Sequence, residues 1–404
     1  ERGRLGRADR EYLEALLGPG YPEPYATHRE AIETIALASS RAPDRPELHY
    51  LLGDALLHYG MPAGEPDPIR RAESALSRAV ELDPGFAGPV GHLMTIAARR
   101  GDTARDRALA DDNLGRLDPA DHGSELALEV RWIAHLAGVG PAPGSRDSLG
   151  SRATDLPLAV DFMYMAAVGG LDPTFALDVV ERYRAGPGAA TDNFRVGSWV
   201  LADITGRADV RDRARGGFES RRRDYFAIGE SLFSRGDPRG GRDARDRLAA
   251  ALAADTTPRD WHVVYACIVA LRDASDGHPA TLATLDASLR ADFAAGEPRT
   301  GRPCRAVVEA LLAVRDDTPD ARRLLERADS MLRPGPRINV LALIPLNLAL
   351  GYAFDAHGDP ARGLAAVRRA ESPYLWPVWL PEKLRAEARL AEAAGDRDAA
   401  IEAY

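Results

Sequence analysis

Apolar residues recur along this chain at the three- and four-residue spacing of amphipathic helices. These periodic segments are about 12 to 18 residues long, and short breaks rich in glycine, proline or aspartate separate them. No segment shows the alternation of apolar and polar residues that is typical of a half-buried strand. The pattern therefore predicts an all-α chain of paired helices that follow one another in series.

The breaks between the predicted helices share a common chemistry. Glycine can take the left-handed conformation that closes one helix, and aspartate can cap the next helix. Such pairs occur at Gly101-Asp102, Gly236-Asp237, Gly358-Asp359 and Gly395-Asp396. The stretch from Gly138 to Gly150 is the richest in Gly, Pro and Ser, which favours an internal linker there.

Residues 46–84 have the spacing of a known helical repeat. Positions 7, 8 and 15 of a 34-residue unit hold Leu52, Gly53 and Gly60. After an insertion within Met61 to Pro68, positions 20, 24, 27 and 32 hold Ala72, Leu76, Ala79 and Pro84. The next unit, which ends at Leu117-Asp118-Pro119, keeps Leu93 and Gly101 but has Met94 at position 8. This spacing resembles the tetratricopeptide repeat, which implies helical hairpins stacked into an αα superhelix.

The same spacing returns near the end of the chain. Positions 7, 8, 11, 15, 20, 24 and 27 hold Leu350, Gly351, Phe354, Gly358, Gly363, Val367 and Ala370. Small residues at positions 8 and 20 should let the two helices of a hairpin approach closely, and larger apolar residues at 7, 11 and 24 should fill the space to the next hairpin. A last partial unit breaks off at Tyr404, and the chain starts without methionine, so we expect a piece of a longer protein.

We expect four segments along the chain. These are an N-terminal helical cap (1–45), tetratricopeptide-like repeats (46–119), degenerate helical-hairpin repeats (120–335) and further tetratricopeptide-like repeats truncated at the C-terminus (336–404). Within the degenerate segment, the pattern pairs residues 261–271 with 281–293 and residues 304–314 with 321–332. One hairpin cannot bury its own apolar face, so stacking is required throughout.

A second resemblance covers the first 60 residues. It rests on the runs Ala8-Asp9-Arg10, Glu14-Ala15-Leu16-Leu17-Gly18, Tyr21-Pro22, Ala42-Pro43-Asp44-Arg45-Pro46-Glu47, Leu52-Gly53-Asp54 and His58-Tyr59-Gly60. These runs resemble the C-terminal repeat region of bacterial eukaryotic-like serine/threonine protein kinases. The resemblance implies an attached kinase core, for which the repeats would sense or recruit partners. Similar repeats also follow DNA-binding or cyclase modules in bacterial regulators.

The basic residues of the chain are almost all arginine, and this excludes some chemistry. Of 52 basic residues only Lys383 is lysine, and there is no glutamine, which favours a GC-rich bacterial source. A phosphate-binding loop and a protein-kinase core each need a lysine within their motifs, and Lys383 has neither motif around it. We therefore expect no such enzyme in this chain, and we expect Lys383 to lie solvated on a helix surface.

Cysteine and histidine give no sign of a metal or redox site. Cys267 and Cys304 lie in apolar helical stretches, which favours buried free thiols. None of the nine histidines forms the i, i+4 pair with a glutamate that a helical zinc site requires, so no metal and no cofactor are expected. The best apolar run, from Ile338 to Phe354, is interrupted by Pro345 and Asn347, and we expect no membrane segment.

A protein or peptide ligand is the partner that the repeat spacing favours. A solenoid of this type usually binds an extended peptide on its concave face, which is lined by first-helix positions. In this chain those positions include Tyr50, Asp54 and His58 in the first unit and His92, Thr95 and Arg99 in the second. The alternative is that these side chains merely face solvent or a neighbouring helix.

The densest basic point, Arg221-Arg222-Arg223, lies in an arginine-rich stretch from Arg207 to Arg247. Arginine forks pair with phosphates and carboxylates, so an acid-binding patch is one hypothesis. The interspersed acidic residues favour the other, a salt-bridged and solvated helix surface. With a net charge of −9 the chain as a whole is acidic, and we expect no nucleic-acid partner. The tryptophans Trp132, Trp199 and Trp261 are expected in the core.

Together these features predict a non-catalytic, protein-binding scaffold or sensor module that regulates an attached serine/threonine kinase. The first alternative is the sensor or oligomerisation segment of a bacterial transcriptional regulator. A more distant alternative is a helical-toroid enzyme, which would need a buried carboxylate cluster. A cytoplasmic location is expected, with the extracytoplasmic domain of a membrane-anchored kinase as the alternative.

Overall fold

The structure is a computed structural model of the chain. It describes residues 5–18, 25, 27–86, 88–116, 172–183, 192–233, 237–254, 259–278, 280–294, 298–336, 340–370 and 379–403. The linker expected from Gly138 to Gly150, Trp132 and the turn residue Gly236 lie outside these residues.

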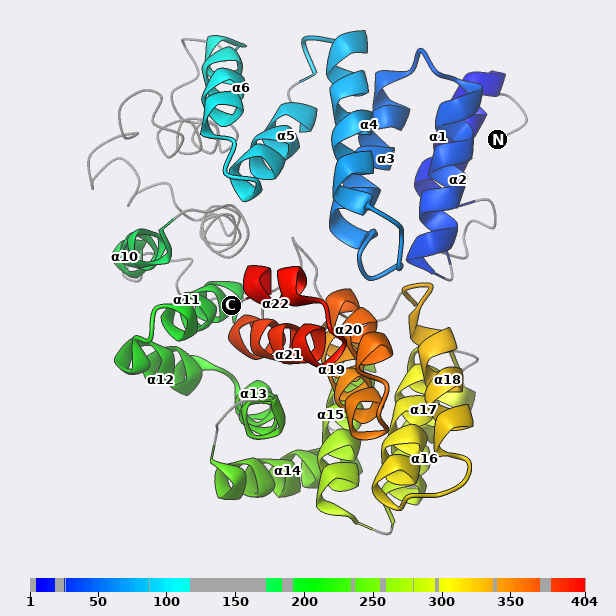
Figure 1. Cartoon of the computed structure of the whole chain (residues 1–404), viewed down its shortest axis with the longest axis vertical. Helices are drawn as coiled ribbons and strands as arrows, with labels where there is room; N and C mark the ends of the chain where they lie inside the picture. The colour runs from blue at the N-terminus through cyan, green and yellow to red at the C-terminus, as the bar shows by residue number, and fades with distance from the viewer. Residues whose placement is uncertain are drawn as a thin grey trace. The chain divides into compact units, whose positions relative to one another are not determined.

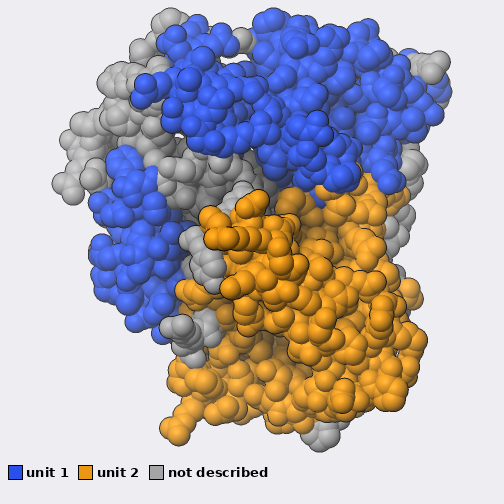
Figure 2. All heavy atoms as spheres, in the orientation of Figure 1, with its two compact units in different colours: residues 1–24, 31–60, 66–217 blue, residues 25–30, 61–65, 218–404 orange. Residues whose placement is uncertain are grey.

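The chain divides into two compact units (Figure 2). Unit 1 comprises residues 1–24, 31–60 and 66–217, and unit 2 comprises residues 25–30, 61–65 and 218–404. The helices of unit 1 are α1 (Arg7–Leu17), α2 (His28–Arg41), α3 (Pro46–Tyr59), α4 (Pro68–Leu82), α5 (Gly88–Arg99), α6 (Thr103–Arg116), α10 (Pro173–Tyr183), α11 (Asp192–Ile204) and α12 (Ala208–Gly217). The first three residues of α2 are grouped with unit 2.

Unit 2 is also built of helices. They are α13 (Ser220–Phe233), α14 (Pro238–Ala253), α15 (Arg259–Asp276), α16 (Thr281–Ala294), α17 (Pro298–Arg315), α18 (Ala321–Leu332), α19 (Val340–Ala356), α20 (Pro360–Arg369), α21 (Leu380–Ala393) and α22 (Arg397–Ala403). Apart from an isolated bridge between Thr27 and Pro336, the described residues contain no β-structure. The all-α fold class predicted from the sequence is confirmed.

Helices that follow one another in the chain pack together as hairpins (Figure 1). The pairs are α3 with α4, α5 with α6, α11 with α12, α13 with α14, α15 with α16, α17 with α18, α19 with α20, and α21 with α22. The pairs α15/α16 and α17/α18 are the ones expected within the degenerate segment. First helices also contact the first helix of the next hairpin, as α3 contacts α5 and α15 contacts α17.

Close approach within the hairpins explains the small residues of the repeat spacing. A methyl group added to Gly53 of α3 would lie 2.5 Å from Cγ of Leu76 in α4. Where α19 and α20 cross, the residues in contact are Gly351 and Gly363. A methyl group on Gly363 would lie 2.8 Å from the carbonyl oxygen of Gly351, so neither position has room for a larger side chain. Positions 8 and 20 of the repeat therefore hold small residues because the backbones of the two helices nearly touch there.

The predicted turn chemistry is present where the turns are described. Gly101, Gly358 and Gly395 have φ angles of 67°, 84° and 79°, in the left-handed region that glycine adopts without strain. Each following aspartate accepts a hydrogen bond from a backbone N–H of the next helix, as Asp102 does from Arg105. Asp237 caps α14 in the same way, through the N–H groups of Arg239 and Gly240.

The core of unit 2 is rich in aromatic side chains. Tyr225 and Phe226 of α13 are fully buried and pack edge to face, with ring centroids 5.2 Å apart. Trp379 lies against both rings and is only 1% exposed. Gly229, one turn further along α13, makes room for the indole, because a methyl group there would lie 2.0 Å from Cζ2 of Trp379.

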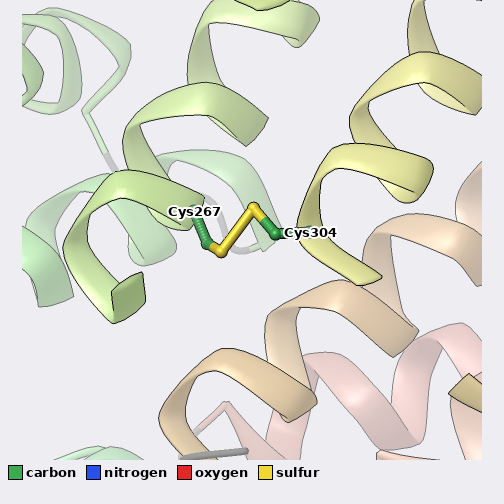
Figure 3. The surroundings of a disulfide bond; sticks show 2 residues. All are labelled: Cys267 and Cys304. Atoms are coloured by element: carbon green, nitrogen blue, oxygen red, sulfur yellow. A yellow bond between two sulfur atoms is a disulfide. The ribbon is translucent and has the colours of Figure 1, made fainter. Parts of the chain in front are cut away.

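The expectation of free thiols is wrong. Cys267 of α15 and Cys304 of α17 form a disulfide, with Cα atoms 5.7 Å apart (Figure 3). Both residues are buried, as expected, but α15 and α17 pack directly on each other and bring the two sulfur atoms together. Sequence reasoning treated each cysteine alone and so missed the helix contact that joins them.

The expectation of a solvated lysine is also wrong. Lys383 is 5% exposed, and its Nζ lies 2.9 Å from Oε2 of Glu387, one turn later on α21. Arg368 of α20 donates a hydrogen bond to the other oxygen of the same carboxylate. The lysine is buried because α21 packs against α20, and the ion pair compensates its charge.

None of the described helices is both long enough and apolar enough to cross a bilayer. The apolar run noted in the sequence forms α19, a 17-residue helix that contains Pro345. Its residues from Leu341 to Leu350 are buried within unit 2.

Candidate functional site

The residues predicted to line a groove gather on two neighbouring first helices of unit 1. Tyr50, Asp54 and His58 lie on α3, and His92 and Thr95 lie on α5. All five side chains are half-buried. We call this surface the α3/α5 face. Arg99 belongs to α5, but its side chain lies outside the described part of the chain.

The α3/α5 face forms because residues four apart share one side of a helix. Asp54 and His58 are so spaced on α3, and α5 packs beside α3 with His92 directed at the same carboxylate. Behind the face, Leu56 and Leu57 of α3 and Val90 of α5 are at most 1% exposed. The polar residues of the face are therefore carried by helices whose other sides are fixed in the core of unit 1.

Asp54 is the centre of the polar contacts on this face. Its Oδ1 lies 3.0 Å from Nε2 of His92 and 3.1 Å from Nε2 of His58. Burial raises the pKa of Asp54, but the hydrogen bonds and positive charge of His58 and His92 outweigh burial and hold this pKa well below its usual range. The carboxylate is therefore ionised at any physiological pH.

Aromatic rings surround this carboxylate. Tyr50 stacks on His92 with ring centroids 5.8 Å apart, and it also contacts Phe86 at 5.0 Å. The rings of His58 and His92 meet edge to face at 5.3 Å. The hydroxyl of Thr95 donates to the carbonyl oxygen of Gly91 and so contacts its own helix. Aromatic, imidazole and carboxylate groups therefore share one partly exposed surface.

The structure also brings together three side chains that can hold a metal ion, which sequence reasoning did not expect. One ligand atom from each of Asp54, His58 and His92 lies within 4.8 Å of the other two. A search for histidine paired with glutamate passes over this set, because the carboxylate comes from aspartate and the second histidine from another hairpin. The sequence feature that could have indicated this set is the separation of Asp54 and His92 by 38 residues, which is about one repeat length.

The three arginines of the predicted basic patch lie in the first turn of α13. Arg222 lies over the ring of Trp261, 4.4 Å from its centroid, and is half-buried. Arg221 is also half-buried, whereas Arg223 is exposed. Arg223 thus differs in exposure from its two neighbours.

Arginines elsewhere in this stretch pair with acidic side chains. The described pairs include Arg207 with Asp209, Arg213 with Glu181, Arg215 with Asp212, Arg245 with Asp273 and Arg247 with Asp224. The last two pairs join consecutive helices. Arg247 of α14 donates to Asp224 of α13, and Arg245 of α14 donates to Asp273 of α15, and both aspartates are buried. These pairs favour the salt-bridged surface over the acid-binding patch. Of the tryptophans expected in the core, Trp199 is buried and Trp261 is half-buried.

The described residues define an all-α protein of helical hairpins with tetratricopeptide-like spacing. No protein-family model matches the chain, and no curated protein matches it. Among solved structures, the chain is similar to the tetratricopeptide-repeat domain of P58(IPK), with 13% identity, 99% of this chain and 92% of that chain covered, and a TM-score of 0.24. The repeat architecture is supported by the hairpin contacts of this chain and does not depend on that similarity.

Proposed function

We propose that this chain is a protein-interaction module that binds a peptide segment of its partner on the α3/α5 face. The observation that supports this is the cluster of Tyr50, His58, His92 and Asp54 on two helices with buried backs. Partly exposed aromatic rings beside a few oriented polar groups are typical of binding surfaces, because the rings supply contact area at little cost in conformational entropy.

Selection of peptides from a random display library on the full chain tests this proposal. Selected peptides should bind the wild-type chain, and Tyr50→Ala should weaken that binding at least ~5-fold, since removing an aromatic anchor costs about 1 kcal/mol or more. Tyr12→Ala, on α1 of the same unit, is the matched control and should leave binding unchanged. Peptides that bind Tyr50→Ala as tightly as wild type would show that the site lies elsewhere.

The finer proposal is that the module regulates an attached serine/threonine kinase. It rests on the sequence resemblance over the first 60 residues. Reading the coding sequence upstream of Glu1 tests it directly. A kinase core there would support the proposal, whereas a DNA-binding module would favour the transcriptional-regulator alternative and leave the binding role of the α3/α5 face intact.

We further propose that this part of the protein works in an oxidising compartment, as the extracytoplasmic alternative requires. Disulfides persist outside the reducing cytosol, and the Cys267–Cys304 bond is buried between two helices. Rapid acid quenching of cells that express the chain, followed by alkylation of free thiols, reports the state of the pair in the cell. Full alkylation of both cysteines would argue for the cytoplasm.

A further inference from the structure

The α3/α5 face carries an arrangement that goes beyond binding a peptide. The carboxylate of Asp54 and the imidazoles of His58 and His92 converge from two helices, with the two Nε2 atoms 3.1 Å and 3.0 Å from one oxygen atom. The two ligand-bearing helices belong to successive hairpins.

We propose that Asp54, His58 and His92 form a three-ligand site for a divalent transition-metal ion, with zinc as the reference ion. Imidazole nitrogen with carboxylate oxygen is a ligand set that suits zinc, cobalt, nickel and copper, whereas calcium and magnesium prefer oxygen ligands alone.

The separations of the ligand atoms fit such an ion. Neighbouring ligands around a tetrahedral zinc ion, with bonds of about 2.0–2.1 Å, lie about 3.3 Å apart. The two measured N–O separations of 3.0 and 3.1 Å are close to this value, and the remaining separation is within 4.8 Å. The two N–O separations are therefore those of neighbouring ligands around one ion.

The site is also accessible. The side chains of His58 and His92 are each 17% exposed and that of Asp54 is 33% exposed, so an ion can enter from solvent. Three protein ligands leave one position of a tetrahedron for water or for a side chain of a bound partner. The helices themselves are held by the hairpin core, since Gly53 of α3 packs on Leu76 of α4.

Without an ion, the same three groups form a hydrogen-bonded triad in which the imidazole N–H groups donate to the carboxylate. The two descriptions differ in a measurable way. In the metal site the same Nε2 atoms bind the ion, so saturable metal binding distinguishes the site from the triad. Metal titration is done without a peptide, so its outcome is independent of the proposed binding function.

The test uses the full chain, free of any histidine tag and treated with chelator. Isothermal titration with Zn²⁺ should show saturable binding of one ion per chain, and Co²⁺ should give the intense visible absorption of a tetrahedral centre. His92→Ala should weaken Zn²⁺ binding at least ~10-fold, because loss of an outer-shell partner alone costs that much. His357→Ala, an exposed turn residue, is the control and should bind as wild type does.

Asp54→Asn and His58→Gln keep the size of the side chains and guard against loss of the fold. Their circular dichroism should match that of the wild type while Zn²⁺ binding falls. Absence of saturable Zn²⁺ and Co²⁺ binding by the wild type would overturn the proposal. Equal binding by the wild type and by folded His92→Ala, Asp54→Asn and His58→Gln would overturn it as well.

Discussion

The close approach of α19 and α20 gives the sharpest prediction about the fold, for the substitution Gly351→Ala. The added methyl group would lie 2.5 Å from Cγ2 of Val367 and 3.0 Å from the carbonyl oxygen of Gly363. Favourable carbon contacts begin at about 3.5 Å, so the first distance is short by about 1 Å. The valine can rotate, but the carbonyl belongs to the backbone, and the two helices must separate.

Overpacking of this kind costs about 1–3 kcal/mol. Alanine returns up to about 1 kcal/mol through its higher helix propensity. From the middle of the overpacking range, about 2 kcal/mol, this leaves a net loss of about 1–2 kcal/mol. Such a loss corresponds to a ~5–30-fold rise in the population of the opened hairpin. Hydrogen exchange followed by mass spectrometry measures this locally, as a fall in protection of the amides of α19 and α20.

The matched control is Gly91→Ala in α5 of the other unit. No heavy atom lies within 4 Å of the methyl group that it adds, so we expect unchanged or slightly higher protection in α5. Unchanged or increased protection of α19 and α20 in Gly351→Ala would refute the explanation given for the small residues at position 8 of the repeat.

Further predictions concern the disulfide, one acidic side chain and the buried ion pair. Under denaturing conditions without reductant, the chain should take up no thiol reagent, and uptake at both cysteines would contradict the bond. Cys304→Ser should lower the free energy of unfolding by up to about 4 kcal/mol, because the disulfide closes a loop of 37 residues. Burial, with the nearby charge of Asp102, raises the pKa of Asp106 to about 6, so ionisation of Asp106 opposes folding as the pH rises from about 4 to 6. In urea titrations at pH 7, Asp106→Asn should therefore be more stable than the wild type, by less than ~1 kcal/mol. Below pH ~4 the two proteins should be equally stable. Glu387→Gln should cost about 3 kcal/mol because it removes the negative charge that pairs with buried Lys383. Lys383→Met should cost less because Glu387 keeps its ion pair with Arg368. The reverse order in urea unfolding would contradict this assignment.

Local chemistry made much of the fold predictable from the sequence. Gly53 and Gly351 mark close helix crossings because a Cβ at either position would crowd the facing helix. The glycine and aspartate of each turn act on the backbone within a few residues. Such effects need no knowledge of distant residues. The pairing of neighbouring helices follows from the same short turns.

The features that were missed depend on contacts between successive hairpins. Cys267 and Cys304 are 37 residues apart, and Asp54 and His92 are 38 residues apart. Both separations are close to one repeat, which brings the two residues onto facing sides of neighbouring first helices. Comparing chemistry-bearing residues at that separation would have indicated both. The burial of Lys383 depends on how α21 packs against α20, and no local pattern reports it.

The disulfide also has a mechanical meaning. In an array of hairpins, a pulling force can unravel one repeat at a time, because each repeat contacts only its neighbours. The bond between α15 and α17 closes a loop of 37 residues that a pulling force cannot lengthen while the bond is intact. At about 3.4 Å per residue, the bond keeps roughly 125 Å of chain from extending. Reduction would release that length, so the redox state of one bond sets how far this part of the protein can stretch under load.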